Sequence, residues 1–372
     1  MLYYFIFFII TLVVIAISEF MIKHKHHKLG FIIGILGICI ISWFFGARKE
    51  TVGTDVTVYM KPYVDYTKSY GLAWLFNNSD VEFLYGLLVG LTCLIDGELS
   101  TLLFLTSFII SLNVYIFAYH MRKEISITAV FMAYLFIISG YTLNIARQSL
   151  AMSFVLLSTI FIRKKKIIPF LICIIAGCLF HITAGVGLIL YPLYKILGEK
   201  HRVIVYALTI VFAASLILFY NQLIQLMGLL NEKYANGGLD KYKYSTLDIN
   251  NTMTIFNILC FILFSFVYYY CKKSNKNNDD RFINLAYACL IIYVIFFEFG
   301  SIIRFIERIS YYFLIISFLY FIPKIPKCVK INENSKGNHF IGSLISIGFC
   351  VGYFVFIFYM MGYSSIMPFE FA

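Results

Sequence analysis

Four arginines stand beside long apolar segments at places where membrane proteins seldom carry positive charge: Arg48, Arg147, Arg304 and Arg308. Positive charge is normally retained on the cytoplasmic side, and the charge pattern described below puts all four on the other side. An ionisable group in or beside a membrane span is a functional candidate. Arginine also grips phosphate through two parallel hydrogen bonds. These arginines therefore predict a site for an anionic, phosphorylated, lipid-linked substrate.

Two of the four have helical contexts that sharpen this prediction. Arg147 and Gln148 open a predicted helix, where a cation opposes the helix dipole unless an anion shares the place. Arg304 and Arg308 are four residues apart and share a helix face, where they repel one another unless a negative group lies between them. The alternatives are that Arg147 snorkels to lipid headgroups and that the later pair forms ion pairs with nearby glutamates.

A transfer reaction on such a substrate also needs a base. His181 is the one histidine within an apolar run, and the reference pKa of histidine lies close to neutrality, which suits a general base. Asp55, in a Gly-Thr-Asp turn, and Glu82, which precedes another apolar run, are weaker candidates. The alternatives are structural. His181 could be a buried histidine bonded to a carbonyl, and Glu82 could be only a favourable charge at a helix N-terminus. No metal-ligand cluster or nucleotide-binding loop occurs, so we predict neither metal nor cofactor.

The composition is that of an integral membrane protein. The 372 residues are 61% hydrophobic and only 13% charged, whereas soluble domains average about 25% charged. No soluble domain of useful size fits between the apolar runs, so we predict a single polytopic membrane domain over residues 1–372. The net charge of +11 is spread over short loops, which indicates topology and argues against nucleic acid. The nine cysteines lie in apolar segments or in the loops placed inside, so no disulfide framework is implied.

Placing the basic loops inside gives an all-α architecture of about 12 transmembrane helices with both termini outside. The basic, cytoplasmic loops are residues 22–29, 120–124, 163–166, 198–202, 271–281 and 323–339. The long external loops are residues 46–98 and 231–252. The predicted spans are residues 2–21, 30–45, 100–119, 125–143, 146–162, 167–180, 182–197, 203–230, 253–270, 282–298, 309–322 and 340–361.

Two segments depart from simple crossings. Residues 81–95 are short for a full span, and a crossing there would put the next basic loop outside, so we predict an extra short re-entrant or interfacial helix on the external side. In the hairpin of residues 167–197, each arm reaches about 20 Å, less than the roughly 30 Å of the hydrocarbon core. The turn that carries His181 is therefore expected below the outer surface, in a cavity rather than in lipid.

Five short motifs occur in order along the chain. They are Arg48 followed by Val52-Gly53-Thr54-Asp55 and Tyr59; Glu82-Phe83-Leu84-Tyr85; Asn144-Ile145-Ala146-Arg147-Gln148-Ser149-Leu150-Ala151; Phe180-His181-Ile182-Thr183-Ala184; and Arg308-Ile309-Ser310-Tyr311-Tyr312-Phe313 running to Pro323. In this the chain resembles the EpsG/Wzy-type polymerases of bacterial surface polysaccharides. The resemblance implies a multi-pass enzyme of the bacterial cytoplasmic (inner) membrane that acts on undecaprenyl-diphosphate-linked oligosaccharides at the outer face.

The resemblance and the residues together give each candidate a role. A polymerase transfers a growing glycan from one lipid diphosphate to a sugar hydroxyl of an incoming repeat, a glycosyltransferase reaction that we expect to need no metal. Arginines would stabilise the departing diphosphate. The diphosphate-binding candidates are Arg48, Arg147, Gln148, Arg304 and Arg308. His181 is the first choice as base, followed by Asp55 and Glu82. The sugar-binding candidates are Tyr59, Tyr311 and Tyr312. A chain-length regulator and a flippase are partners implied by the resemblance alone.

Other functions stay open at this point. An O-antigen ligase uses similar residues, although its usual large external loop is not obvious here. A flippase for the lipid-linked repeat would need charges along a continuous central cavity, whereas these charges collect on one side. A membrane acyltransferase would need access to a cytoplasmic acyl donor. Neither the sugars and linkage, nor the choice among O-antigen of lipopolysaccharide, capsule and exopolysaccharide, follows from the sequence.

Overall fold

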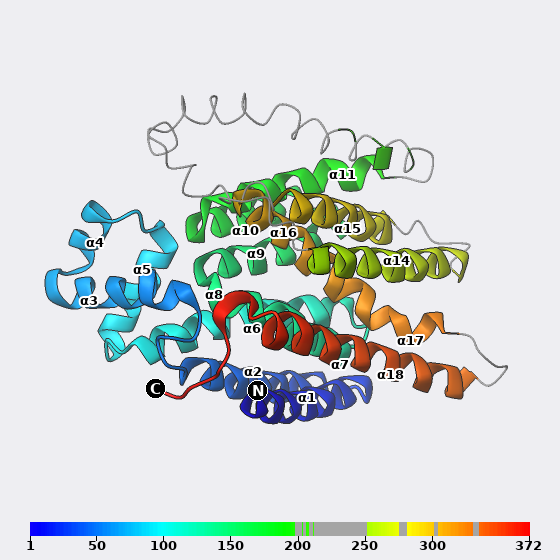
Figure 1. The fold of residues 1–372 in the computed structure, drawn as a ribbon, viewed down its shortest axis with the longest axis horizontal. Helices are drawn as coiled ribbons and strands as arrows, with labels where there is room; N and C mark the ends of the chain where they lie inside the picture. Colours follow the sequence, from blue (N-terminus) through cyan, green and yellow to red (C-terminus); the bar gives the residue numbers. More distant parts are fainter. Residues whose placement is uncertain are drawn as a thin grey trace. The chain divides into compact units, whose positions relative to one another are not determined.

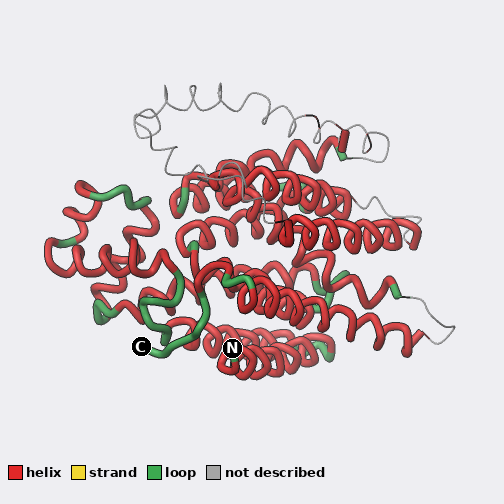
Figure 2. The backbone as a smooth tube through the Cα atoms, in the orientation of Figure 1, coloured by secondary structure: helices red, strands yellow, loops and turns green. Residues whose placement is uncertain are grey.

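The computed structural model describes residues 1–197, 203, 206–207, 211, 251–274, 281–300, 304–329 and 335–372, and this part of the chain is built from helices (Figures 1 and 2). The predicted cytoplasmic loop 198–202 and most of the predicted span 203–230 and external loop 231–252 lie outside the described residues. The same is true of parts of the predicted loops 271–281 and 323–339. The contacts divide the chain into two compact units: unit 1, Met1–Gly185 with Ile322–Ala372, and unit 2, Val186–Phe321.

The protein is a polytopic membrane protein by the length and hydropathy of its helices. In the described ranges, eight helices are long and apolar enough to cross a membrane: Leu2–Lys23, His27–Gly46, Leu99–Met121, Ile127–Asn144, Met253–Lys273, Arg281–Gly300, Ile306–Cys328 and Gly337–Met360. These match eight of the twelve predicted spans. Helices also form at residues 146–163, 167–180 and 182–196, where spans are predicted, but they are not among the eight. The count of twelve crossings therefore stays a prediction.

Unit 1 contains the N-terminal helices and the C-terminal ones. Its longer elements are α1 (Leu2–Lys23), α2 (His27–Gly46), α3 (Lys61–Tyr70), α5 (Phe83–Ile95), α6 (Leu99–Met121), α9 (Ala146–Arg163), α10 (Ile167–Phe180) and α18 (Ser335–Tyr353). Shorter elements join them: η1 (Val56–Met60), α4 (Leu72–Asn78), α7 (Ile127–Ala133), η2 (Tyr134–Ile138), α8 (Ser139–Asn144), η6 (Ile322–Lys324), α17 (Ile325–Cys328), η7 (Phe354–Met360) and η8 (Tyr363–Ser365).

Unit 2 is described through four α-helices: α11 (Leu190–Ile196), α14 (Asn251–Ser274), α15 (Arg281–Gly300) and α16 (Arg304–Phe321). The 3₁₀ segment η3 (Ile182–Ile189) crosses the boundary between the units. Helices α15 and α16 are packed against each other along their lengths.

Small and hydroxylated residues bring the helices of unit 1 close together. A Cβ on Gly34 of α2 would lie 2.3 Å from the Tyr115 ring of α6, so only glycine allows this approach. The Ser18 hydroxyl of α1 donates to the Gly30 carbonyl at 2.7 Å and is bonded to the Tyr115 hydroxyl at 2.8 Å. Close backbone approach with hydrogen bonds across helices is the usual way in which membrane helices associate.

The region predicted as an external loop, residues 46–98, is largely helical. Helices α3, α4 and α5 fold together and project from one end of the long helices of unit 1 (Figure 1). Helix α5 bears out the short helix predicted at residues 81–95, and its place relative to a membrane stays a prediction. An exposed apolar stripe runs along it through Phe83, Leu87, Leu91 and Leu94, while its other face packs on the protein.

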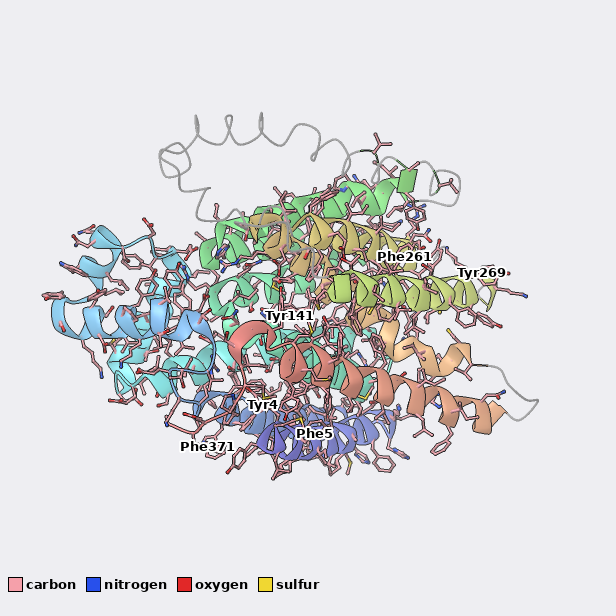
Figure 3. The ribbon with its side chains drawn as sticks, viewed as in Figure 1. Tyr4, Phe5, Tyr141, Phe261, Tyr269 and Phe371 are labelled. Atoms are coloured by element: carbon pink, nitrogen blue, oxygen red, sulfur yellow. The ribbon has the colours of Figure 1, made fainter. Side chains whose placement is uncertain are left out.

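Residues Gly362–Ala372, which begin with the short helix η8, form a strap along the loop that follows α2. The Lys49 amide donates to the Glu370 carbonyl and the Ala372 amide to the Ala47 carbonyl, both at 2.9 Å. The strap is fastened to α1 by aromatic side chains, and Tyr4 and Phe371 lie at this end of the helix (Figure 3). We call this segment the C-terminal strap.

Candidate functional site

The Gly-Thr-Asp turn is seated directly on the joint between α8 and α9. Gly53 has a φ of +91°, and a Cβ there would lie 2.3 Å from the Leu143 carbonyl oxygen. The backbone amide and the hydroxyl of Thr54 both donate to the Asn144 side-chain oxygen, at 2.9 and 2.6 Å. A glycine is required here both by the left-handed backbone and by the close contact. Two of the sequence motifs are therefore parts of one structure.

Arg147 lies in the first turn of α9, immediately beyond this joint. Its Nη1 donates to a carboxylate oxygen of Glu82 at 2.7 Å, and both side chains are mostly buried, 13% and 19% exposed. Its guanidinium carbon stands 4.6 Å from the centre of the Tyr59 ring and 5.7 Å from that of Tyr63. Tyr59 projects from η1, a π-helical turn of the kind that often occurs at functional sites.

The positive charge of Arg147 interacts unfavourably with the helix dipole at the N-terminus of α9, and two kinds of group compensate for this. Glu82 supplies negative charge, and the tyrosine rings offer their negative faces. Burial raises the pKa of the Tyr63 phenol, and the positive charge of Arg147 opposes part of that rise. Asp55 and Tyr85 are also within electrostatic reach of Arg147. We refer to Arg147, Glu82, Tyr59, Tyr63 and Tyr85 as the Arg147 cluster.

Arg48 is directed at backbone rather than at an open site. It is 3% exposed, and it donates to the Phe45 carbonyl at 2.7 Å, the Val52 carbonyl at 3.2 Å and the Leu143 carbonyl at 3.4 Å. Burial lowers the pKa of its guanidinium to about 10, so it stays charged near neutrality. The structure thus places Arg48 as a clamp between the end of α2, the Gly-Thr-Asp turn and α8.

His181 ends α10 at the level of Arg147. Helices α9 and α10 form an antiparallel pair whose backbones approach at Gly177, where a Cβ would lie 3.3 Å from the Ala151 carbonyl oxygen. His181 is one turn beyond Gly177 and Arg147 one turn before Ala151, about 6 Å along the pair in each case. The His181 Nδ1 is hydrogen-bonded to the Thr183 hydroxyl at 2.6 Å, which fixes the ring. The cavity predicted around this turn stays a prediction.

Gln148 and Asp55 are both buried in unit 1, at 3% and 9% exposure. Gln148 follows Arg147 in the first turn of α9, and Asp55 begins the segment that leads into η1. The structure thus brings both of them to the end of unit 1 that also carries Arg147, Glu82 and Tyr59.

The remaining predicted residues belong to unit 2. Tyr311 of α16 donates to the Glu307 carboxylate at 2.5 Å, Tyr312 is buried, and Arg308 is exposed. Arg304 opens α16, but its side chain lies outside the described residues. In the same unit the Glu298 carboxylate accepts hydrogen bonds from Thr254 at 2.6 Å and Asn257 at 3.0 Å.

Two members of the Arg147 cluster were not singled out from the sequence. Tyr63 follows Tyr59 by four residues, a spacing that puts both rings on one helix face, but η1 and α3 were not predicted. Tyr85 stands in the quoted Glu82 motif, three residues after the glutamate, without a role of its own. Nothing in the sequence signals that its phenol is buried. Within the described ranges, no three His, Cys, Asp or Glu side chains gather closely enough to hold a metal ion.

Comparison with known proteins decides the family. A family model, described as the EpsG family, matches residues 31–371. The chain belongs to the EpsG family. EpsG-family membership associates this chain with exopolysaccharide synthesis. The match spans both compact units and includes every candidate residue named above. No curated protein and no solved structure matches the chain.

Proposed function

We propose that this EpsG-family protein polymerises undecaprenyl-diphosphate-linked oligosaccharide repeats into surface polysaccharide at the outer face of the bacterial cytoplasmic membrane. The observation that carries the proposal is the Arg147 cluster: a guanidinium at a helix N-terminus, backed by two tyrosine rings and held by one carboxylate. Such a group stabilises developing negative charge on a leaving diphosphate. The family's association with exopolysaccharide synthesis supports the choice of substrate.

The reaction is a glycosyl transfer with one bond made and one broken. A hydroxyl oxygen of the incoming repeat attacks the anomeric carbon of the growing chain, and the bond from that carbon to the diphosphate oxygen breaks. The lipid diphosphate leaves with the electron pair, and a base takes the hydroxyl proton. Arg147 stabilises the leaving group. His181, Glu82 and Asp55 are the candidate bases, and Tyr59 is the sugar-facing ring in the cluster.

Glu82 and Arg147 have a further relationship that suits this chemistry. An anionic substrate must compete with the Glu82 carboxylate for the guanidinium, because the two are joined at 2.7 Å in the structure. When the diphosphate binds Arg147, the Glu82 carboxylate is released from the guanidinium and can face the attacking hydroxyl instead. Substrate binding would thus free Glu82 to act as a base.

Substitution of His181 tests whether it is the general base. We expect His181→Ala to lower turnover by about 100-fold, measured on the purified full chain in lipid nanodiscs with a synthetic lipid-diphosphate-linked repeat. Thr183→Val removes the hydrogen bond to Nδ1 and keeps the imidazole, so it should cost a smaller factor. If turnover is unchanged in His181→Ala, His181 is not the base, and Glu82 and Asp55 become the candidates for that role.

The function itself is tested by the surface glycan of a strain that lacks this protein. Loss of the polymer ladder with a single repeat left on the acceptor lipid supports polymerisation. Absence of any surface glycan favours the ligase or flippase readings, and an unchanged ladder contradicts all three. Complementation should restore the ladder with the wild-type chain and with Arg122→Ala. Arg122 is a matched control, since its guanidinium also covers a tyrosine, Tyr119, at 4.0 Å, outside the Arg147 cluster.

A further inference from the structure

Tyr85 of α5 is fully buried, yet its hydroxyl has no hydrogen-bond partner among the residues that the structure describes. A second buried donor in the same cluster, the Nε–H of Arg147, also lacks a partner within those residues. Buried polar groups are nearly always bonded, and leaving one unbonded costs free energy. Two such donors in one cluster point to a bound group that would satisfy both.

The two donors belong to side chains that both adjoin the Tyr63 ring. The centre of that ring is 6.3 Å from the centre of the Tyr85 ring and 5.7 Å from the Arg147 guanidinium carbon. The positive charge of Arg147 acts on the Tyr85 phenol, as does the negative charge of Asp55. A ligand that presents several acceptor oxygens could therefore reach both donors.

The chemistry of the donors selects the ligand. An arginine Nε–H can only donate, and a tyrosine hydroxyl donates readily, so each of the two requires an acceptor oxygen. The charge of Arg147 favours an anionic oxygen, and the Glu82 carboxylate already occupies Nη1 of the same guanidinium. Glu82 stands three residues before Tyr85, at the start of the same helix. The carboxylate thus marks where an anion is held in the absence of substrate.

We propose that the Tyr85 hydroxyl and the Arg147 Nε–H together bind the substrate's diphosphate, after that diphosphate has displaced Glu82 from Arg147. Departure of the carboxylate opens the way to the two buried donors. This inference rests on the proposed function for the identity of the substrate, but binding of the anion can be measured without any turnover. Tyr85 is accordingly a substrate-binding residue. Its unbonded hydroxyl lowers the stability of the substrate-free protein, and the protein tolerates this cost because the hydroxyl binds substrate.

The variant Tyr85→Phe separates this role from a structural one, because it removes the hydroxyl and keeps the ring. A hydroxyl that serves only packing would lower the melting temperature when removed. An unbonded one leaves the melting temperature unchanged or raises it. The matched control is Tyr134→Phe, since Tyr134 is equally buried but is bonded to the Ser111 hydroxyl at 2.9 Å. That variant should melt lower and bind anions as the wild type does.

The measurement is titration of the purified full chain in lipid nanodiscs with inorganic pyrophosphate, followed by turnover of a lipid-diphosphate-linked repeat. We expect Tyr85→Phe to weaken pyrophosphate binding about tenfold with an unlowered melting temperature, and Arg147→Ala to abolish binding. Equal binding by Tyr85→Phe and wild type, or a lower melting temperature in Tyr85→Phe, would overturn the inference.

The two proposals fail in different ways. Tyr85-dependent pyrophosphate binding without turnover of the lipid-linked repeat would contradict the polymerase function and leave the anion site in place. Turnover with Tyr85-independent pyrophosphate binding would support the polymerase and contradict the role of Tyr85. If Tyr85→Phe loses turnover while pyrophosphate binding is unchanged, the hydroxyl acts on the sugar and not on the diphosphate.

Discussion

Helix α9 carries an arginine near each end, and the two are accommodated in opposite ways. Arg163 stands in the last turn, where a cation suits the helix dipole, and it pairs with Glu124 while both remain about one-third exposed. Arg147 stands in the first turn against the dipole, is buried more deeply, and is compensated by a carboxylate and two aromatic rings.

We propose that this difference separates a structural arginine, Arg163, from a substrate-binding one, Arg147. The surroundings of Arg163 are what helix electrostatics alone would select, so its contribution is modest and local. The surroundings of Arg147 involve residues from η1, α3 and α5, which a structural ion pair would not require. An unfavourable charge that is supported so extensively is a candidate for binding something that arrives later.

The largest effect, and the largest contrast, should come from replacing the two arginines of α9 by alanine in separate variants. Arg147→Ala is expected to lower turnover by about 100-fold or more, since it removes the charge that we propose stabilises the leaving diphosphate. Arg163→Ala should stay within about twofold in turnover and lose at most about 1 kcal/mol of stability. Turnover and melting temperature of both purified variants make the check. Equal loss of turnover in the two would remove the distinction between the helix ends.

An intermediate effect should follow from disturbing the joint beneath Arg147. Gly53→Ala adds a Cβ against the Leu143 carbonyl at a φ of +91°, and we expect a loss of about 1–3 kcal/mol. The lower melting temperature should be accompanied by lower turnover. Gly348→Ala is the control, because a Cβ there meets nothing within 4 Å. A Gly53→Ala protein as stable as the control would contradict the tight seating of the turn.

The smallest effect should come from Tyr59, whose ring covers Arg147. Tyr59→Ala removes a cation–π contact of about 1 kcal/mol, which corresponds to roughly fivefold in turnover. Tyr59→Phe keeps the ring face and should behave as wild type. If Tyr59→Phe also loses turnover, the hydroxyl and not the ring is what the site uses, and the sugar-binding role predicted for Tyr59 gains support.

The sequence predicts the helices of the bundle well, because long apolar runs between basic loops leave few other structures for a membrane chain. It does not predict α3 and α4, since Lys61–Tyr70 is a short amphipathic segment with charged residues that resembles any polar loop. The short helix α5 was expected from its length and charge balance, and it forms at Phe83–Ile95. The division into two compact units has no signature in hydropathy.

The candidate site, like the fold, could be predicted only in part from the sequence. The Arg147 position was found because a cation at a helix start is electrostatically conspicuous. Its pairing with Glu82 could not be derived, because 65 residues separate the two and only the packing of α5 against the α9–α10 region brings them together. Arg48, like Arg147, is an arginine beside an apolar segment in the sequence. In the structure, however, its guanidinium donates hydrogen bonds to three backbone carbonyls. Residue type identified the candidates, and tertiary contacts distinguish them.

The C-terminal strap has a consequence for the order in which the protein is made. The Gly53 amide donates to the Ser365 carbonyl and the Lys49 amide to the Glu370 carbonyl, so the Gly-Thr-Asp turn is fastened by residues translated more than 300 positions later. The turn therefore leaves the ribosome before these partners exist and gains them only after residues 365–370 have been made. A nascent chain that has not yet reached these residues carries an incomplete site, so the site is completed only after the intervening chain has been synthesised.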